Sequence, residues 1–212
     1  METENKLPQL TLEEQRVLGS LIEKSKTTPD YYPMTLNGIV TACNQKSSRN
    51  PVVDFDEETV VSAIDSLKKK HLAANVIGGG SRAIKYRHSI AVTFPLDPAE
   101  TSIICLLLLR GPLTPGEINS NSGRLHDFDS LDEVISTIDG LMNSETPFIK
   151  LLPKKPGQKE ARYCHLFGDN FSDESEEKSI SKSNLEERLA SVENELAELK
   201  ESFANLLKEL GV

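Results

Sequence analysis

The residues best suited to chemistry are four histidines and three cysteines, and their spacing argues against a shared metal site. The histidines are His71, His88, His126 and His165, and the cysteines are Cys43, Cys105 and Cys164. None of them falls at the short paired spacings that zinc sites use. The cysteines lie far apart among apolar neighbours, which is typical of reduced thiols in a core. We therefore expect neither a bound metal nor a disulfide.

A glycine-rich run at 78–82 is the stretch most similar to a phosphate-binding loop. Such loops follow a strand and open a helix, so that the helix N-terminus faces the anion. Here a second strand is predicted to follow, so we interpret the run as the tip of a hairpin. No nucleophile elbow, Walker loop or His-Glu-x-x-His motif occurs in the sequence. The sequence therefore predicts no enzyme activity and no cofactor.

Basic residues concentrate in the segment 31–96, which holds eight Lys and Arg against five Asp and Glu, although the whole chain has a net charge of −9. DNA-binding proteins take much of their affinity from phosphate contacts, so candidate nucleic-acid contacts belong in this segment. Arg49 and Asn50 are the candidates for reading bases, and the others for holding phosphates. The full set is Lys46, Ser47, Arg49, Asn50, Lys68, Lys69, Lys70, Arg82, Lys85 and Arg87.

An internal duplication organises the chain. The run Val60–Leu67 returns as Val134–Leu141 with six of its eight positions identical or similar, and an Asp-Phe-Asp precedes each copy. A repeat of this kind indicates two copies of one structural unit.

The first copy predicts three helices and a hairpin. Thr11 with Glu14 forms a capping box before the first helix, Thr35 caps a short second helix, and Asp56 caps the third. The Asn50-Pro51 step is expected to end the second helix, because the residue before proline is disfavoured in the helical region. Strands are predicted at 72–77 and 83–90, and the inward side chains of the third helix are Val60, Val61, Ile64 and Leu67.

The second copy repeats this order. Asp97-Pro98 and Thr114-Pro115 each place proline just inside a helix start, where its missing N–H costs nothing. The predicted helices are 98–110, 115–122 and 130–144, and the predicted strands are 148–152 and 161–167 around a basic loop at 153–157. Three helices and a hairpin define a winged helix. The expected fold is therefore α+β, mainly α, with winged-helix domains at 9–91 and 96–168.

The C-terminal sequence predicts self-association. Residues 169–183 are rich in Ser, Asp, Glu and Lys, which is typical of a flexible acidic linker. In 184–212, apolar residues fall at alternating steps of four and three, the heptad pattern of a coiled coil: Leu185, Leu189, Val192, Leu196, Leu199, Phe203, Leu206 and Leu210. A homodimer is favoured, with trimers and tetramers open. The alternative is one amphipathic helix that docks on its own body.

Several sequence motifs resemble the YceH family of bacterial proteins. They include Tyr32-Pro33, Leu36-Asn37-Gly38, the run 40–46 and Arg49-Asn50-Pro51-Val52 in the first half. Leu107–Gly111, Thr114–Glu117, Pro156-Gly157, Arg162-Tyr163 and His165-Leu166-Phe167 extend the likeness through the second half. The resemblance covers nearly the whole chain. It implies a tandem winged-helix fold in a bacterial cytosolic protein, and it implies no established activity.

Two functions fit these features. The first is binding of double-stranded DNA, in the manner of a transcription regulator, through the third helix and wing of the first unit. Glu57, Glu58 and Asp65 on that helix oppose this function, because they would repel phosphate. The second is a protein-interaction adaptor without nucleic-acid binding. A cytoplasmic location is expected, because no apolar run is long enough to span a membrane and the polar N-terminal sequence does not resemble a signal peptide.

Overall fold

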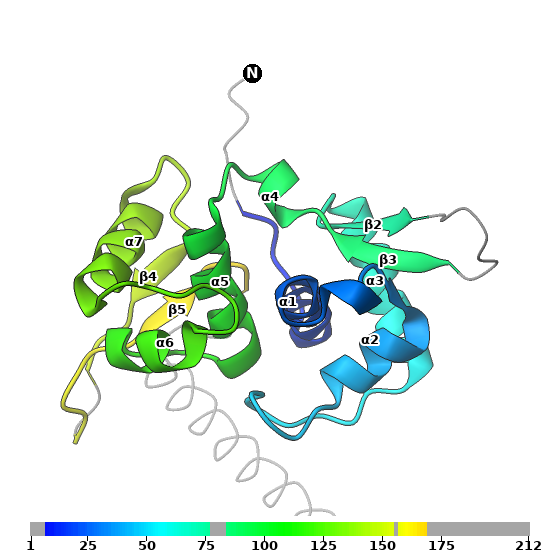
Figure 1. Cartoon of the computed structure of the whole chain (residues 1–212), viewed down its shortest axis with the longest axis horizontal. Helices are drawn as coiled ribbons and strands as arrows, with labels where there is room; N and C mark the ends of the chain where they lie inside the picture. Colours follow the sequence, from blue (N-terminus) through cyan, green and yellow to red (C-terminus); the bar gives the residue numbers. More distant parts are fainter. Residues whose placement is uncertain (1–6, 77–83, 155–156, 169–212) are drawn as a thin grey trace, which may run out of the picture. The chain divides into compact units, whose positions relative to one another are not determined.

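The computed structural model describes residues 7–76, 84–154 and 157–168. Figure 1 shows the elements of the first half around a central helix. In chain order they are α1 (Leu12–Thr27), η1 (Pro29–Tyr31), β1 (Met34–Thr35), α2 (Leu36–Cys43), α3 (Glu57–Lys69), β2 (Ala73–Val76), β3 (Lys85–His88) and α4 (Ile90–Thr93). The second half contains α5 (Pro98–Arg110), α6 (Pro115–Ser122), α7 (Leu131–Asn143), β4 (Ile149–Leu151) and β5 (Tyr163–His165). The fold is α+β and mainly helical, as predicted.

The predicted helix starts are confirmed by their capping hydrogen bonds. Thr11 and Glu14 form the reciprocal capping box of α1, and Asp97 with Glu100 does the same for α5. Thr35 and Thr114 cap α2 and α6. Each cap satisfies a backbone N–H that has no partner within its own helix. These local signals therefore placed the helix starts to within a residue.

The two copies differ slightly at the third helix. Asp56 caps α3, whereas α7 is capped by Ser130 rather than by the preceding Asp129. Glu133 still reaches back, and its carboxylate accepts the Asp129 backbone N–H at 2.7 Å. The repeat at Val60 and Val134 therefore begins one turn inside each helix.

Three predictions about the first half were wrong. The strand predicted at 83–90 ends at His88, and Ile90 begins helix α4, which the sequence patterns did not predict. The second helix ends at Cys43 rather than at the Asn50-Pro51 step, because the Asn44 side chain pairs with the backbone of Phe55 in both directions at 2.8 Å. Val61 is 37% exposed rather than inward, while Val60, Ile64 and Leu67 are buried and Ala63 takes the remaining inward position.

The sheets contain a strand that the sequence patterns did not predict. β1 pairs with β3, which also pairs with β2, giving the antiparallel order β1-β3-β2. In the second half β4 pairs with β5, and Leu113 exchanges two backbone hydrogen bonds with Tyr163. Met34 and Leu113 both lie directly before a threonine cap of the next helix. The duplication therefore extends to a third strand. This strand is two residues long in the first half and is reduced to a single bridge at Leu113 in the second half.

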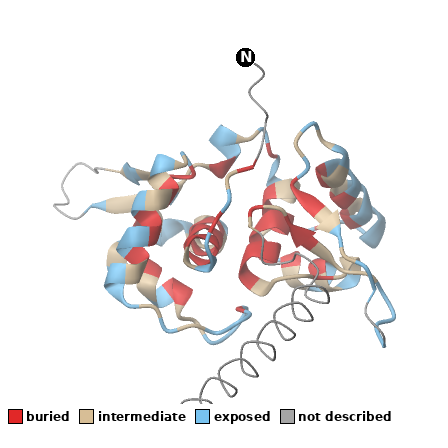
Figure 2. Cartoon of the chain, turned by 180° about the vertical axis from the view of Figure 1, so that it is seen from behind, coloured by how far each residue is buried: buried red, intermediate tan, exposed pale blue. Residues whose placement is uncertain are grey.

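Helices α1 and α5 form the centre of the described chain and pack against each other. Residues 14–22 of α1 and 101–109 of α5 are all buried, as the red colouring of α1 shows in Figure 2. Gly19 allows the close approach, because a Cβ at this position would lie 2.9 Å from the Leu109 side chain. The thiol of Cys105 donates to the Gly19 carbonyl at 3.4 Å. The two halves therefore share one core.

The start and the end of this region are also joined. The Leu10 backbone N–H donates to the Phe167 carbonyl at 2.6 Å, and Leu7 and Leu10 are buried. Phe94 contacts Phe148 and Phe167 edge-on, with ring centroids 5.4 and 5.9 Å apart. These contacts add aromatic packing to the aliphatic core.

The predicted linker at 169–183, the heptad tail at 184–212 and Arg82 lie outside the described residues. The coiled coil and the domain boundaries stay predictions. None of the helices within the described ranges is long and apolar enough to cross a membrane.

Candidate binding surfaces

The loop between α2 and α3 is held in place by two buried arginines. The Arg16 guanidinium, on the buried side of α1, donates to the carbonyls of Cys43 and Pro51. The Arg49 guanidinium donates to the Ala42 carbonyl at 2.9 and 3.2 Å and to the Ser48 carbonyl at 3.0 Å. Buried backbone carbonyls need such donors. The sequence patterns did not identify Arg16, although an arginine beside Val17 in an apolar stripe was a signal for it.

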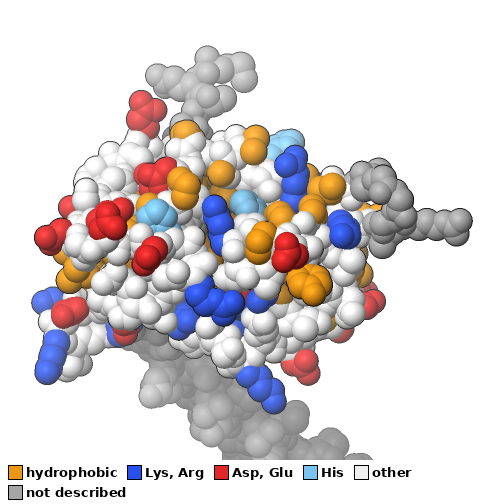
Figure 3. Space-filling view, viewed as in Figure 1, with side chains coloured by type: hydrophobic (Ala, Val, Ile, Leu, Met, Phe, Trp, Pro, Cys, Tyr) orange, Lys and Arg blue, Asp and Glu red, His pale blue; other side chains and the backbone are white. Residues whose placement is uncertain are grey.

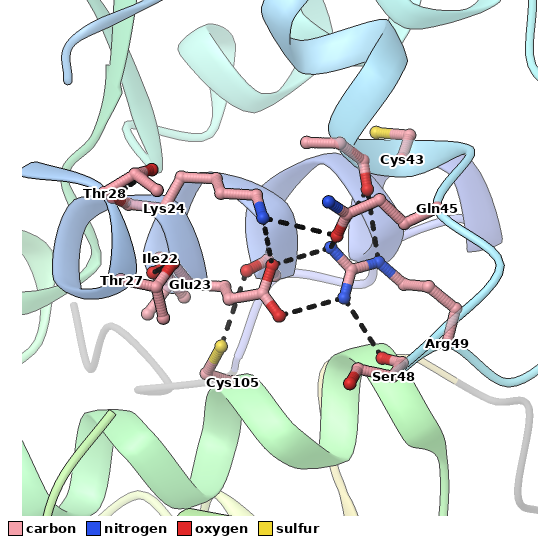
Figure 4. Close-up of polar contacts among 12 residues, drawn as sticks. Ile22, Glu23, Lys24, Thr27, Thr28, Cys43, Gln45, Ser48, Arg49 and Cys105 are labelled. Carbon is pink, nitrogen blue, oxygen red and sulfur yellow. Dashed lines mark hydrogen bonds and ion pairs between the residues drawn. The ribbon is translucent and has the colours of Figure 1, made fainter. Parts of the chain in front are cut away.

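Arg49 also forms a buried ion pair with Glu23, drawn in Figure 4. Its two terminal nitrogens lie 3.0 and 2.7 Å from the two carboxylate oxygens, a bidentate arrangement. Burial raises the pKa of Glu23, but the hydrogen bonds and charge of Arg49, helped by Lys24, outweigh burial and bring that pKa below its usual value. The structure therefore uses the Arg49 guanidinium inside the protein, away from the surface where a base reader would lie.

Asn50 connects the two halves. Its backbone N–H donates to the Leu109 carbonyl at 2.9 Å, and its side-chain amide donates to the Arg110 carbonyl at 3.3 Å. Both acceptors belong to the last turn of α5, whose carbonyls lack partners within the helix. Asn50 is exposed, but its hydrogen bonds serve as a cap for α5. Both proposed base readers are thus occupied by contacts within the chain.

The other predicted contacts are divided between free and occupied side chains. Lys68 pairs with Asp65 at 3.1 Å, and Lys70 pairs with Glu14 at 2.7 Å and donates to the Gln9 carbonyl. Lys46, Ser47, Lys69 and Arg87 are exposed, and Lys85 is half-buried on β3. The surface that remains available for phosphate is smaller than the sequence suggested.

The solvent-facing side of α3 is acidic. We call this surface the α3 face, and its members are Glu57, Glu58, Val61, Ser62 and Asp65. The same positions of α7 form the α7 face: Leu131, Asp132, Ile135, Ser136 and Asp139, all exposed. A shallow groove of about 480 Å³ borders the α3 face, between it and the start of α1. Its lining carries the carboxylates of Glu13, Glu14 and Glu58.

A second groove has the opposite character. We call it the inter-half groove, because α1 and the loop at 45–48 form one wall, and the ends of α5 and α6 form the other. Its volume is about 390 Å³, and Lys24, Arg110 and Arg124 contribute positive charge to it. Figure 3 shows Lys and Arg side chains gathered in the middle of this face.

The three cysteines lie buried in the core. Burial raises the pKa of Cys43 and of Cys164 to about 11 and raises that of Cys105 as well, so these thiols stay protonated at neutral pH. All three are buried, as predicted. Among the described residues, no three His, Cys, Asp or Glu side chains are grouped as metal ligands.

The fold and these surfaces describe a mainly helical α+β protein built from a duplicated unit. Residues 10–158 match a family described as "Protein of unknown function, DUF480". The chain is 43% identical over 205 residues to a UPF0502 protein of Shewanella piezotolerans, covering 91% of this chain and 94% of that protein. It is 42% identical over 211 residues to the UPF0502 protein YceH of Escherichia fergusonii, covering 96% and 98%. The chain belongs to the UPF0502 (YceH) family, which confirms the resemblance found in the sequence.

Proposed function

We propose that the chain is a non-enzymatic binding protein made of two tandem winged-helix units, whose third helices, α3 and α7, dock a protein partner. The order helix, strand, helix, helix, strand, strand in the first half and the strand order β1-β3-β2 support the winged-helix assignment. Leu113 and β4-β5 supply the matching arrangement in the second half.

The observation that carries the proposal is the equivalence of the two exposed faces. Glu58, Val61 and Asp65 of the α3 face correspond to Asp132, Ile135 and Asp139 of the α7 face. Val61 and Ile135 are 37% and 38% exposed, although both are β-branched apolar residues. The two copies therefore present the same combination, one apolar side chain between two carboxylates, on the helix that a winged helix ordinarily uses for binding.

This combination suits a basic protein segment better than DNA. A carboxylate within about 4 Å of a phosphate costs roughly 1 kcal/mol even in water, and more where water is excluded. A lysine or arginine of a partner would instead be attracted by Glu13 and Glu58, and the groove that they line has room for such a side chain. Glu14, in the same groove, is already paired with Lys70.

DNA binding is the second candidate, and one observation favours it. Lys46 and Ser47 on the α2–α3 loop, Lys69 at the end of α3 and Arg87 on β3 are all exposed, and the described residues offer none of them a carboxylate partner. These are positions from which a winged helix reaches the phosphate backbone. In this arrangement the contacts would be to phosphates, with little reading of bases.

Site-specific photo-crosslinking in cells tests the first proposal. Benzoylphenylalanine replaces Val61 or Ile135 in the full chain, and Val92, which is 83% exposed, serves as the control position. We expect the same protein to be crosslinked from Val61 and Ile135 and not from Val92. Charge reversal of the neighbours should abolish each crosslink: Glu58→Lys with Asp65→Lys for the first, and Asp132→Lys with Asp139→Lys for the second. Crosslinks that survive these reversals would contradict docking through the two faces.

Fluorescence anisotropy with a random DNA duplex at low salt tests the second candidate. If Lys46, Lys69 and Arg87 each neutralise one phosphate, log affinity should fall with log salt at a slope of about −2.7. The variant with Lys46→Glu, Lys69→Glu and Arg87→Glu should then bind much more weakly. Tight binding with this slope, together with absence of a protein crosslink, would replace the first proposal by DNA binding.

A further inference from the structure

The inter-half groove contains positive charge that the described residues do not neutralise. Glu23 is the one carboxylate among its lining residues, and the buried Arg49 offsets that charge. Lys24 lies 3.2 Å from Glu23, so it shares this same carboxylate. Arg110 donates to the Ser48 hydroxyl at 2.9 Å and has no carboxylate partner among the described residues. Arg124 is exposed and makes no hydrogen bond or ion pair within the described chain.

Helix C-termini account for part of this charge but not all of it. Lys24, Arg110 and the Ser120-Asn121 pair lie in the last turns of α1, α5 and α6, which all end at the groove. Each helix C-terminus carries about half a negative charge, so the three C-termini together carry about one and a half. Three cationic side chains exceed this amount by more than one charge. In a chain of net charge −9, such a surplus in one groove is a local exception.

The rest of the lining favours an organic ligand over a bare ion. The hydroxyls of Ser47 and Ser48 and the amide of Gln45 supply hydrogen-bonding groups, whereas the Ser120 hydroxyl already donates to the Gly116 carbonyl. Leu106 and Leu109 supply an apolar wall. Small-molecule sites combine apolar surface with a few polar groups, in volumes of roughly 300 to 1,000 Å³. A groove of about 390 Å³ is at the small end of this range.

We propose that the inter-half groove binds a small organic phosphate, with the phosphate group held by Arg110 and Arg124 and the remainder against the leucine wall. Guanidinium groups match phosphate oxygens in a bidentate way, and serine hydroxyls can donate to the same oxygens. Both halves contribute to the groove, so a bound ligand contacts α1, the 45–48 loop, α5 and α6 together. The site is independent of the α3 and α7 faces and of the partner proposed for them.

Isothermal titration calorimetry and thermal unfolding of the full chain test this site with defined probes. The probes are ribose 5-phosphate, a set of nucleoside monophosphates, inorganic phosphate and, as an anion without phosphate, succinate. We expect at least one organic phosphate to bind more tightly than inorganic phosphate and succinate. At a ligand concentration one hundred times Kd, the Tm should rise by roughly 5 to 10 °C. Absence of binding by every organic phosphate in the set would overturn the proposal.

Variants separate this site from nonspecific charge. Arg124→Gln removes an exposed side chain that forms no hydrogen bond or ion pair with the described residues, so the fold should be retained and the affinity should fall at least tenfold. Ser120→Trp fills the groove without changing its charge and should also abolish binding. The matched control is Lys159→Gln, an exposed cation of the loop between β4 and β5 that does not line the groove, which should bind as the unaltered chain does. Equal affinity in Arg124→Gln and in the control would contradict the assignment.

DNA backbone phosphate offers the same chemistry, and a competition arm distinguishes the two sources. A random duplex should neither bind with Arg124 dependence nor displace the small phosphate. If the duplex alone binds and Arg124→Gln weakens it, the groove is a DNA contact and the small-ligand proposal fails. Charge reversal at Glu58 and Asp65 should leave phosphate binding unchanged, so the two proposals can fail separately.

Discussion

Two guanidinium nitrogens of Arg49 lie 3.0 and 2.7 Å from the two carboxylate oxygens of Glu23, and the Arg49 side chain is 0% exposed. The same guanidinium donates to the carbonyls of Ala42 and Ser48. A residue whose type and position predict a DNA contact is thus an internal support of the α2–α3 loop. This loop carries Lys46, Ser47 and Ser48 to the surface, so Arg49 positions the residues that can bind rather than binding itself.

We expect Arg49→Met to lower the free energy of unfolding by about 3 to 5 kcal/mol, the usual cost of removing one partner of a buried ion pair. Glu23 would lose its main partner, and the Ala42 carbonyl would lose both of its donors from Arg49. Urea unfolding measures the change. Lys69→Met, an exposed lysine at the end of α3, is the control and should change stability by less than about 0.5 kcal/mol. A stable Arg49→Met variant would mean that the interior role is minor.

Gly19→Val should destabilise the fold by about 1 to 3 kcal/mol, the typical cost of overpacking a core. The added Cβ alone would lie 2.9 Å from the Leu109 side chain and 3.2 Å from the Leu108 Cβ, so α1 and α5 would have to separate. Gly140→Ala in α7 is the matched control, since its Cβ finds only a Glu100 oxygen at 3.9 Å. That change should stabilise by up to about 1 kcal/mol, because alanine is the better helix former. Thermal denaturation of both variants should therefore shift in opposite directions.

Stability should fall as the pH is lowered from about 6.5 to about 4. Burial, with the charges of Lys26 and Arg87, lowers the pKa of His88 to about 4, and burial lowers that of His165 to about 4. The unfolded chain, with ordinary histidine pKa values near 6.5, binds these protons more readily, so stability is fully present above pH 6.5 and is lost on the way down. Glu23 and Glu14, whose pKa values are lowered, add a further loss below about pH 4.5.

Urea unfolding at pH 7.5, 6.5, 5.5 and 4.5 checks this dependence. His88→Gln should flatten the profile between pH 6.5 and 4.5. His71→Asn should not, because His71 is exposed and asparagine tolerates its positive φ of 59°. A free energy of unfolding that stays constant over this range would contradict the prediction.

Self-association through the heptad tail is tested with the full chain of 23.4 kDa. Leu196→Lys with Phe203→Lys places charges at two predicted a positions, which should convert a dimer to a monomer in sedimentation velocity. Ala197→Lys with Ala204→Lys adds the same charges at predicted b positions and should leave the mass unchanged. Equal masses for the two double variants would remove the coiled coil as the means of association.

The sequence predicted the features that depend on local chemistry. Thr11, Thr35, Asp97 and Thr114 cap the helices that their side chains indicated, because a cap needs only its own first turn. Strand β1 was missed, since two residues carry no period, and its pairing with Tyr86 joins positions far apart in sequence. Val61 was misassigned for a related reason: it adjoins Val60 in an apolar pair, and only the packing of α3 decides which one is buried.

The candidate site was less predictable than the fold. The roles of Arg49 and Asn50 depend on their contacts with Glu23 and Leu109. These residues are distant in sequence, so no local pattern shows that they are close in space. The sequence showed the charge of Arg49 and the polarity of Asn50, but it did not show that both side chains bind groups within the chain. The inter-half groove was unpredictable for the same reason. Lys24, Arg110 and Arg124 belong to segments that only the packing of α1 against α5 brings together.

The hydrogen bond from Leu10 to Phe167 makes the described region closed on itself: the path along the chain returns to its starting point. Such a closed path can be opened elsewhere. We expect a circular permutant that links Gly168 to Leu7 and begins at Pro112, between α5 and α6, to retain both central helices and the strand pairings β1-β3-β2 and β4-β5. If it folds, the fold does not depend on the order in which the ribosome delivers the two copies.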